Sequence, residues 1–269
     1  MDESVEAESS ADAIWNRAGC ARCRSNRVEF QFSFAFQPIV DVVTGQIYAY
    51  EALVRGPGSQ PAASVLDQLD EENRYHFDQQ CRVRAIEIAT KLGMPEDIKL
   101  SINFDPNALY DPVLCIRTTM IAAEKYKFDV ERLLFELTEH RKVEDTERLN
   151  RILDHYANFG FPTAIDDFGA GFAGLGLLAK FRPHLTKIDR ELVMHSDRDE
   201  ARQAILCGTV ATCAALRMET VAEGVERMEE FEFLRGLGIR LFQGYLIAKP
   251  AFEALPQPDL SRFLTAPTA

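Results

Sequence analysis

Short apolar runs alternate along most of the chain with longer segments of helical periodicity. The runs are rich in β-branched and aromatic residues and are bounded by turn-forming residues, which predicts strands. We expect strands at Phe32–Val40, Ile47–Leu53, Lys99–Asn103, Leu133–Glu136, Pro162–Ile165, Leu185–Ile188, Thr220–Ala222 and Arg240–Phe242. Apolar residues at helical spacing predict helices at Asn73–Leu92, Val113–Lys127, Thr146–Phe159, Ala173–Phe181, Arg198–Leu216 and Arg227–Leu237.

The repeated order of strand and helix predicts an α/β fold with a parallel sheet, either doubly wound or closed into a barrel. The first two strands are an exception, because only a few residues around Thr44-Gly45 separate them. So short a link suits an antiparallel hairpin, since a parallel crossover needs about a dozen residues or more. The chain has 269 residues, close to the roughly 250 of a single barrel. We therefore predict a modified TIM-type (β/α)8 barrel with one antiparallel strand.

Residues 1–27 lack this periodicity and are rich in Ala, Ser and Glu. We expect them to form a tail or short adaptor, and residues 28–269 to form the barrel. Cys20 and Cys23 form a CxxC, which is either half of a zinc site, a redox pair or part of an inert turn. The other four cysteines have no matching spacing and are expected to be buried, reduced thiols.

Composition and charge narrow the class of protein. Hydrophobic residues make up 46% of the chain and charged residues 27%, the balance of a globular protein that buries a core. Met1–Ser10 is acidic and polar rather than a signal sequence, and no apolar run could span a bilayer. We expect a cytoplasmic protein without membrane contact. A net charge of −12 disfavours binding to nucleic acid polymers, so an anionic substrate would need metal ions.

Polar side chains stand at the ends of nearly all the predicted strands. They are Glu51, Asn103, Glu136, Asp166, Asp167, Lys187, Glu223 and Gln243. Singly, each suits a cap, a turn or a solvated surface charge, but repeated placement at the same strand end favours one shared site on the active-site face of a barrel. Carboxylate and amide oxygens favour Mg²⁺ or Mn²⁺ over zinc, and Asp166 with Asp167 could bridge two ions that activate water against a phosphodiester.

The chain from about Phe36 to Pro250 resembles the EAL family of cyclic di-GMP phosphodiesterases. The motifs that carry the resemblance are Gln37-Pro38-Ile39, Glu51-Ala52-Leu53-Val54-Arg55, Ser101-Ile102-Asn103, Glu136-Leu137-Thr138-Glu139, Asp166-Asp167-Phe168-Gly169-Ala170-Gly171, Lys187-Ile188-Asp189, Glu223-Gly224-Val225-Glu226 and Gln243-Gly244-Tyr245. The resemblance implies hydrolysis of cyclic di-GMP to linear pGpG with two Mg²⁺ or Mn²⁺ ions.

The same resemblance implies a role for each matching residue. The first ion would be held by Glu51, Asn103, Glu136 and Asp166, with Asp166 bridging to a second ion held by Asp167. Lys187 would contact the attacking water or the phosphate, Glu223 would act as a general base or support the second metal, and Gln243 would position nearby groups. Substrate contacts are implied for Gln37, Leu53, Arg55 and Pro250, and Glu139 would anchor the loop that follows Asp167.

Three functions remain in competition at this point. The first is the enzyme, the second a receptor that binds the dinucleotide without cleaving it, and the third a protein-interaction module in which the barrel is only a scaffold. The retained ligands favour the enzyme. Ala170 stands where the family commonly has threonine, in a loop thought to couple dimerisation to the active site. We expect a homodimer, with any input signal coming from the tail, from dimerisation or from a regulatory protein partner.

Overall fold

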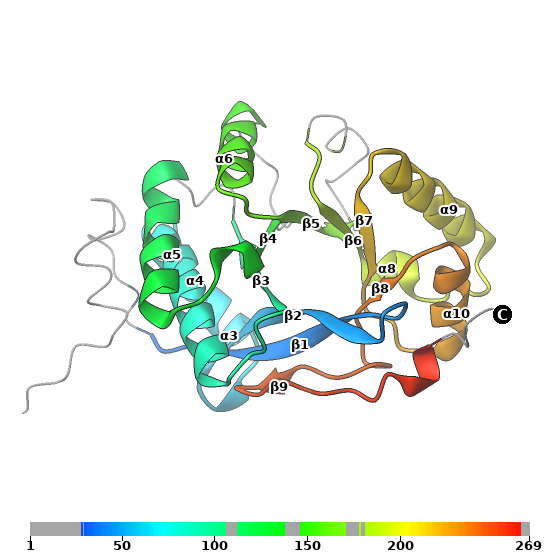
Figure 1. Ribbon diagram of the computed structural model, residues 1–269, viewed down its shortest axis with the longest axis horizontal. Coiled ribbons are helices and arrows are strands. Elements are labelled where there is room, and N and C mark those ends of the chain that lie inside the picture. The colour runs from blue at the N-terminus through cyan, green and yellow to red at the C-terminus, as the bar shows by residue number, and fades with distance from the viewer. Residues whose placement is uncertain are drawn as a thin grey trace, which may run out of the picture.

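The structure is a computed structural model that describes residues 28, 30–105, 112–137, 146–170, 178 and 181–264. Its centre is a ring of strands, namely β1 (Ser33–Asp41), β2 (Gln46–Arg55), β3 (Lys99–Phe104), β4 (Leu133–Leu137), β5 (Thr163–Phe168), β6 (Leu185–Ile188), β7 (Glu219–Ala222) and β8 (Leu241–Phe242). From β2 to β8, neighbours follow chain order and are parallel. Strand β1 pairs antiparallel with both β8 and β2 and closes the ring. The predicted barrel with one antiparallel strand is confirmed (Figure 1).

Strands β1 and β2 form the predicted hairpin. Their pairing runs from Asp41 opposite Gln46 to Ser33 opposite Arg55, so β2 continues past its predicted end at Leu53. A further strand, β9 (Ala251–Phe252), pairs with the first half of β1. It was not predicted, because so short a strand has no periodicity to detect.

Helices surround the barrel (Figure 1). They are α3 (Ala63–Leu66), α4 (Arg74–Lys91), α5 (Pro112–Tyr126), α6 (Thr146–Asn158), α8 (Arg190–Val193), α9 (Glu200–Ala215) and α10 (Met228–Gly236), with 3₁₀ turns η1 (Pro57–Ser59), η3 (Val130–Arg132) and η4 (Ser261–Phe263). The five longer helices of the described residues match predicted ones to within about two residues. The helix predicted at 173–181 lies largely outside the described residues. No described helix combines the length and apolar character needed to cross a bilayer.

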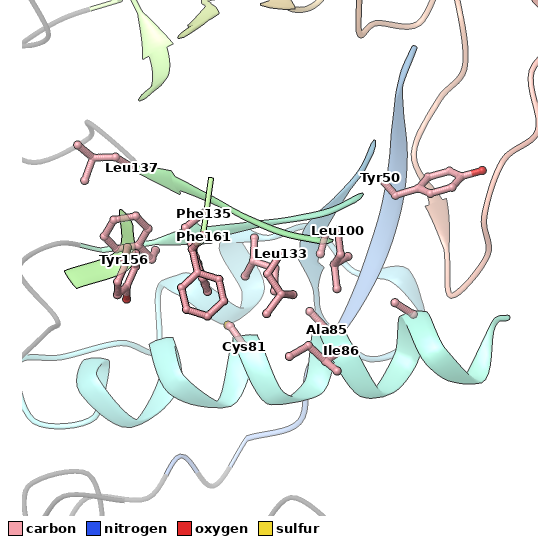
Figure 2. Packing of buried hydrophobic residues seen from close by; sticks show 14 of the residues in the cluster. Tyr50, Cys81, Ala85, Ile86, Leu100, Leu133, Phe135, Leu137, Tyr156 and Phe161 are labelled. Carbon is pink, nitrogen blue, oxygen red and sulfur yellow. The ribbon is translucent and has the colours of Figure 1, made fainter. Parts of the chain in front are cut away.

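Apolar side chains form a layer on each side of the strands. Outside, Phe135 packs on Tyr156 and Phe161 with ring centroids 4.9 and 5.3 Å apart, between the sheet and the helices (Figure 2). Inside the barrel lies a smaller cluster, the floor layer, made of Ile39, Ala49, Leu134, Ala164, Leu185, Val221 and Leu241. Because strand side chains alternate, the residue two positions along each strand also points inward.

The buried side chain of Arg82 links α4 to α6 and to the strands of the barrel. The Arg82 guanidinium is fully buried, donates to the Tyr156 hydroxyl at 2.7 Å and pairs with Asp78 at 2.7 Å. It also lies over the rings of Phe104 and Phe135, at 5.7 and 5.2 Å from their centroids. These contacts fix the ends of β3 and β4, where predicted site residues lie.

Candidate active site

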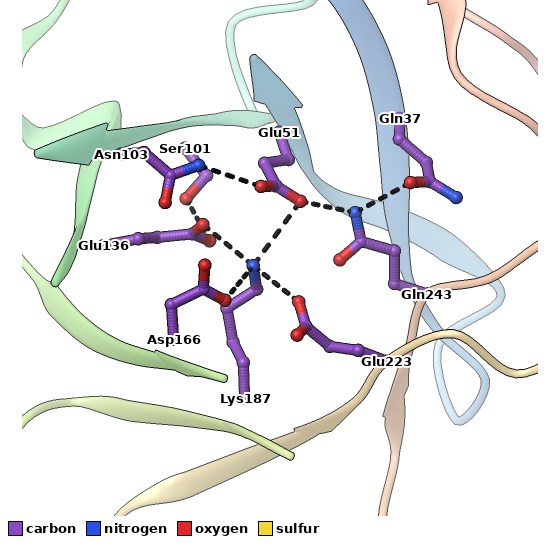
Figure 3. A network of polar contacts seen from close by, with 9 residues as sticks. All are labelled: Gln37, Glu51, Ser101, Asn103, Glu136, Asp166, Lys187, Glu223 and Gln243. Carbon is purple, nitrogen blue, oxygen red and sulfur yellow. Dashed lines mark hydrogen bonds and ion pairs between the residues drawn. The ribbon is translucent and has the colours of Figure 1, made fainter. Parts of the chain in front are cut away.

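The barrel interior changes from apolar to polar within one layer. Each member of the polar layer stands two positions from a floor residue, on the same side of its strand, and these members are Gln37, Glu51, Glu136, Asp166, Lys187, Glu223 and Gln243. On β3 the polar residue is Asn103, which stands above Ser101. The side chains predicted from strand ends therefore converge in one place (Figure 3). Glu223 and Gln243 directly follow β7 and β8, and the other members lie within their strands. Asp166 does so because β5 extends to Phe168, past its predicted end at Ile165.

Asp166 and Asp167 are consecutive residues of β5, and in a regular strand their side chains would point to opposite faces. Here the pairing of β5 with β6 shifts register between Ile165 and Phe168, and Asp167 has a φ of 53°. This irregularity brings carboxylate oxygens of both residues within 4.8 Å of Glu223. A left-handed φ costs on the order of 1–2 kcal/mol, and Asp adopts it more readily than most residues.

The Lys187 ammonium is the centre of the cluster and is only 1% exposed. Its Nζ lies 2.6 Å from Glu223 Oε1, 2.8 Å from Glu136 Oε2, 2.9 Å from Asp166 Oδ1 and 3.4 Å from Glu51 Oε2 (Figure 3). One positive charge thus faces four carboxyl groups in a poorly hydrated interior, where charge interactions are strong.

Burial and the Lys187 charge set the protonation of these acids. Burial raises the pKa of Glu136 to about 8, although Lys187 opposes the shift. Burial likewise raises the pKa of Glu223 well above its ordinary range. At Glu51 burial is outweighed by Lys187 and by hydrogen bonds from Gln243 and Asn103, which hold its pKa below the ordinary value.

For Lys187 itself burial opposes the charged form, but the surrounding carboxylates hold its pKa well above the usual range. The lysine therefore stays charged, while the pKa values of Glu136 and Glu223 indicate that its single charge does not keep every neighbouring acid ionised. A divalent cation would supply the missing positive charge.

The oxygen atoms of the cluster fit such a cation. Two groups of three carboxylates, Glu51 with Glu136 and Asp166, and Asp166 with Asp167 and Glu223, each place their oxygens within 4.8 Å of one another. Asp166 belongs to both groups, as a bridging ligand would. The Asn103 amide donates to Glu51 Oε1 at 3.0 Å, and in the described part of the chain no donor reaches its buried Oδ1. This all-oxygen set suits Mg²⁺ or Mn²⁺.

A cavity of about 810 Å³ opens above the cluster. Its lining includes Gln37, Leu53 and Arg55, three of the predicted substrate contacts. Gln37 is held in place, because its Nε2 donates to Ala248 O at 3.1 Å and its Oε1 accepts from Gln243 at 3.3 Å.

Some predicted residues lie apart from this site or beyond the described part of the chain. Pro250 is absent from the described lining of the cavity and stands directly before β9. The predicted loop anchor Glu139 lies outside the described residues, as do Cys20 and Cys23. The expected burial of the other cysteines holds for Cys81 and Cys213, whereas Cys207 is exposed; the side chain of Cys115 is not described.

One residue of the site had no role in the sequence analysis. Ser101 is fully buried below Asn103 and donates from Oγ to Glu136 Oε1 at 2.5 Å (Figure 3). The pattern that could have indicated it is the period of two along β3, which places Ser101 and Asn103 on the same face.

The fold is a closed α/β barrel, and a cluster of carboxylates suited to divalent cations lies at the carboxyl ends of its strands. The EAL domain family matches residues 23–250 of the sequence. The chain belongs to the EAL domain family.

Solved structures of the family resemble this one closely. A standalone versatile EAL protein from Vibrio cholerae O395, in its c-di-GMP-bound form, is 47% identical with a TM-score of 0.84, and the match covers 89% of this chain and 100% of that one. BlrP1 of Klebsiella pneumoniae, in a manganese and cyclic di-GMP complex at pH 9.0, is 33% identical with a TM-score of 0.78, over 84% of this chain and 58% of that one.

Curated relatives include proteins with different named functions. The blue light- and temperature-regulated antirepressor BluF of Escherichia coli K12 is 31% identical over 83% of this chain and 55% of its own length. The cyclic di-GMP phosphodiesterase NbdA of Pseudomonas aeruginosa is 28% identical over 88% of this chain and 30% of its own length. The chain thus spans about half or less of the length of these relatives.

Proposed function

We propose that the chain is a metal-dependent phosphodiesterase that hydrolyses cyclic di-GMP to linear pGpG with two Mg²⁺ or Mn²⁺ ions. The observation that carries the proposal is the pair of carboxylate groups that share Asp166 beneath the cavity. The relatives support the substrate, since NbdA is named for this activity and BlrP1 was solved with manganese and the dinucleotide. The cavity is of the size that holds small-molecule ligands.

The chain's own residues have distinct tasks in this mechanism. Bound Mg²⁺ or Mn²⁺ would make water acidic enough to attack at neutral pH and would offset the charge of the phosphodiester. Glu51, Asn103, Glu136, Asp166 and Asp167 would hold the ions. Attack forms one bond from the water oxygen to phosphorus and breaks the bond to the 3′ oxygen of one ribose, leaving a 5′-phosphate and a 3′-hydroxyl.

Two further residues are proposed to assist proton transfer and to stabilise charge. Glu223 belongs to the second carboxylate group and is proposed to accept the proton of the attacking water. Lys187 is charged and buried among the same acids, where it orients them and stabilises negative charge on the reacting phosphate.

Gln243 donates to Glu51 Oε2 at 2.7 Å and fixes that ligand. Arg55 and Leu53 line the cavity and are proposed to contact the dinucleotide, with Arg55 on a phosphate.

A second candidate is a protein that binds without hydrolysis, as a dinucleotide receptor or as a protein-interaction module. The observation behind it is that BluF, which matches most of this chain, is named an antirepressor. The complete carboxylate cluster favours the enzyme, because a receptor has no need of a shared Asp166 between two cation-binding groups.

We also propose a homodimer that acts in the cytoplasm, with a regulatory partner supplying input. Light scattering of the purified protein tests the dimer.

Metal dependence tests the enzymatic proposal. The purified chain should hydrolyse cyclic di-GMP with Mg²⁺ or Mn²⁺, and Ca²⁺ should inhibit because its looser coordination suits in-line attack poorly. Chromatography of the nucleotides at fixed times gives the rates. Equal turnover in excess chelator would contradict the proposed mechanism, and intact cyclic di-GMP under every metal condition would favour the second candidate.

A further inference from the structure

On β3, Ser101 takes the position that apolar floor-layer residues take on the other strands of the barrel. On the other strands of the ring, the residue that lies beneath a polar site residue is apolar, as Ala49 is beneath Glu51 and Leu134 beneath Glu136. On β3 that place is taken by Ser101, which is fully buried. A hydroxyl buried in an apolar layer is unfavourable unless it forms a hydrogen bond, so its partner indicates its role.

The partner is one oxygen of a proposed cation ligand. Ser101 Oγ donates to Glu136 Oε1 at 2.5 Å, while Glu136 Oε2 faces Lys187 Nζ at 2.8 Å (Figure 3). The two oxygens of the Glu136 carboxylate therefore have separate neighbours. Oε1 is held from below by the hydroxyl, and Oε2 is turned towards the cluster with Glu51 and Asp166.

Two hydrogen bonds hold the Glu136 carboxylate, one from Ser101 to Oε1 and one from Lys187 to Oε2. The terminal torsion of a glutamate is broad and roughly two-fold, so the carboxylate plane turns readily unless a hydrogen bond holds it. The contact joins neighbouring strands, since Ser101 and Glu136 lie on β3 and β4, and it is short. Partners of this kind behind a metal ligand typically change metal affinity about 10–100-fold when removed.

We propose that Ser101 is a positioning residue for the cation site, whose hydroxyl holds the Glu136 carboxylate with one oxygen turned towards the carboxylate cluster. The inference rests on the proposed function, because it assumes that Glu136 binds an ion. Ser101 does not touch the substrate, and its role is exerted through Glu136 alone.

The test is a calorimetric titration of Mn²⁺ into the metal-free chain and its Ser101→Ala variant. We expect the variant to bind Mn²⁺ about 10–100-fold more weakly. Its rate of hydrolysis should be recovered by raising the Mn²⁺ concentration, with the KM for cyclic di-GMP nearly unchanged at saturating metal. Ser101→Thr keeps the hydroxyl and should restore most of the affinity.

A matched control separates positioning from packing. Val221→Ala removes bulk from the same floor layer without removing a hydrogen bond, so it should destabilise the fold yet leave Mn²⁺ affinity within about twofold. If Ser101→Ala does not fold, Ser101→Cys retains the volume with a weaker donor and should show an intermediate affinity.

The outcomes distinguish this inference from the proposed function. If the unmodified chain binds Mn²⁺ and hydrolyses cyclic di-GMP, but Ser101→Ala binds Mn²⁺ with unchanged affinity, the positioning role is overturned and the proposed function stands. Equal losses of affinity in Ser101→Ala and Val221→Ala would also overturn it. If the unmodified chain does not bind Mn²⁺, the proposed function fails and the role of Ser101 fails with it.

Discussion

At the scale of single residues, the site is built on unfavourable placements that each need compensation. Lys187 is a buried ammonium, Glu136 is a fully buried carboxyl group, and Asp167 is a non-glycine residue with a left-handed φ. Such placements tend to gather at functional sites, where the surrounding structure holds them. In this chain each placement serves one arrangement, in which several acids share a small volume around one lysine.

Substitution of Asp167 should separate hydrolysis of cyclic di-GMP from its binding. Asp167→Asn keeps a residue that tolerates a φ of 53° but removes the charge proposed to hold the second ion, so turnover should be abolished. Binding should survive, because Arg55 and the first carboxylate group remain. Calorimetric titration of cyclic di-GMP beside a turnover assay measures both. Near-normal turnover would remove Asp167 from the mechanism, and loss of both properties would mean that its carboxylate organises the whole site.

Substitution of Glu223 tests its proposed role in proton transfer. Glu223→Gln keeps the shape of the side chain but cannot accept a proton, so kcat should fall by about 10²–10⁴-fold, the usual worth of general acid–base help. Circular dichroism must show an intact fold for the comparison to count. A loss that appears only in KM would assign Glu223 to substrate binding and not to proton transfer.

At the scale of elements, the site depends on how closely the ends of β7 and β8 approach. Gly244 follows Gln243, and a Cβ atom there would lie 2.1 Å from Val225 O and 2.3 Å from Val225 N. Val225 N also donates to Gln243 O at 3.1 Å, so the two loops are joined backbone to backbone beside a site residue. Only glycine permits this contact, because the atoms that a Cβ would meet belong to the main chain of Val225 and cannot turn away.

Gly244→Ala should therefore displace Gln243 and lower both stability and activity. We expect a loss of about 1–3 kcal/mol in the free energy of unfolding, the range for overpacking, together with a clear drop in kcat. Gly208→Ala in α9 is the control, since a Cβ there meets nothing within 4 Å, and it should stabilise the chain by about 0.5–1 kcal/mol. Urea denaturation checks both variants. Equal stability of the two would contradict the close approach.

Elements also show what the sequence could and could not predict. Strands such as β4 were found because each begins with a compact apolar run, and the site because a polar residue such as Glu136 follows that run. The irregularity that aims both Asp166 and Asp167 inward depends on pairing with β6, so no local pattern predicts it. The extension of β2 to Arg55 likewise follows from pairing with β1. The lysine at the centre of the acids was predicted as a site residue, but its contacts are tertiary and could not be derived from one strand.

At the scale of the whole molecule, the acid cluster links stability to pH. The pKa of Glu136 is about 8 in the folded chain, above its ordinary value of 4.5, so the folded state holds a proton that the unfolded state has lost between these limits. The stabilisation from this group is complete below pH 4.5 and is lost as the pH rises towards 8. The metal-free chain should therefore become less stable across this window.

The expected slope is roughly 1.4 kcal/mol per pH unit from this group alone. Mg²⁺ should flatten or reverse it, because the ion replaces the proton and binds more tightly as the acids ionise. Urea denaturation from pH 5 to 8, in chelator and in Mg²⁺, measures the difference. Parallel curves in the two series would mean that no ion binds among these acids.

The central claim is that this cluster directs water onto a phosphodiester of cyclic di-GMP. The most direct test is mass spectrometry of the nucleotides formed when the purified chain is incubated with cyclic di-GMP and Mg²⁺ in ¹⁸O-labelled water. The proposed mechanism predicts linear pGpG with one labelled oxygen in its 5′-phosphate, formed with Mg²⁺ and absent with chelator. Unchanged cyclic di-GMP, or a linear product without the label, would contradict it.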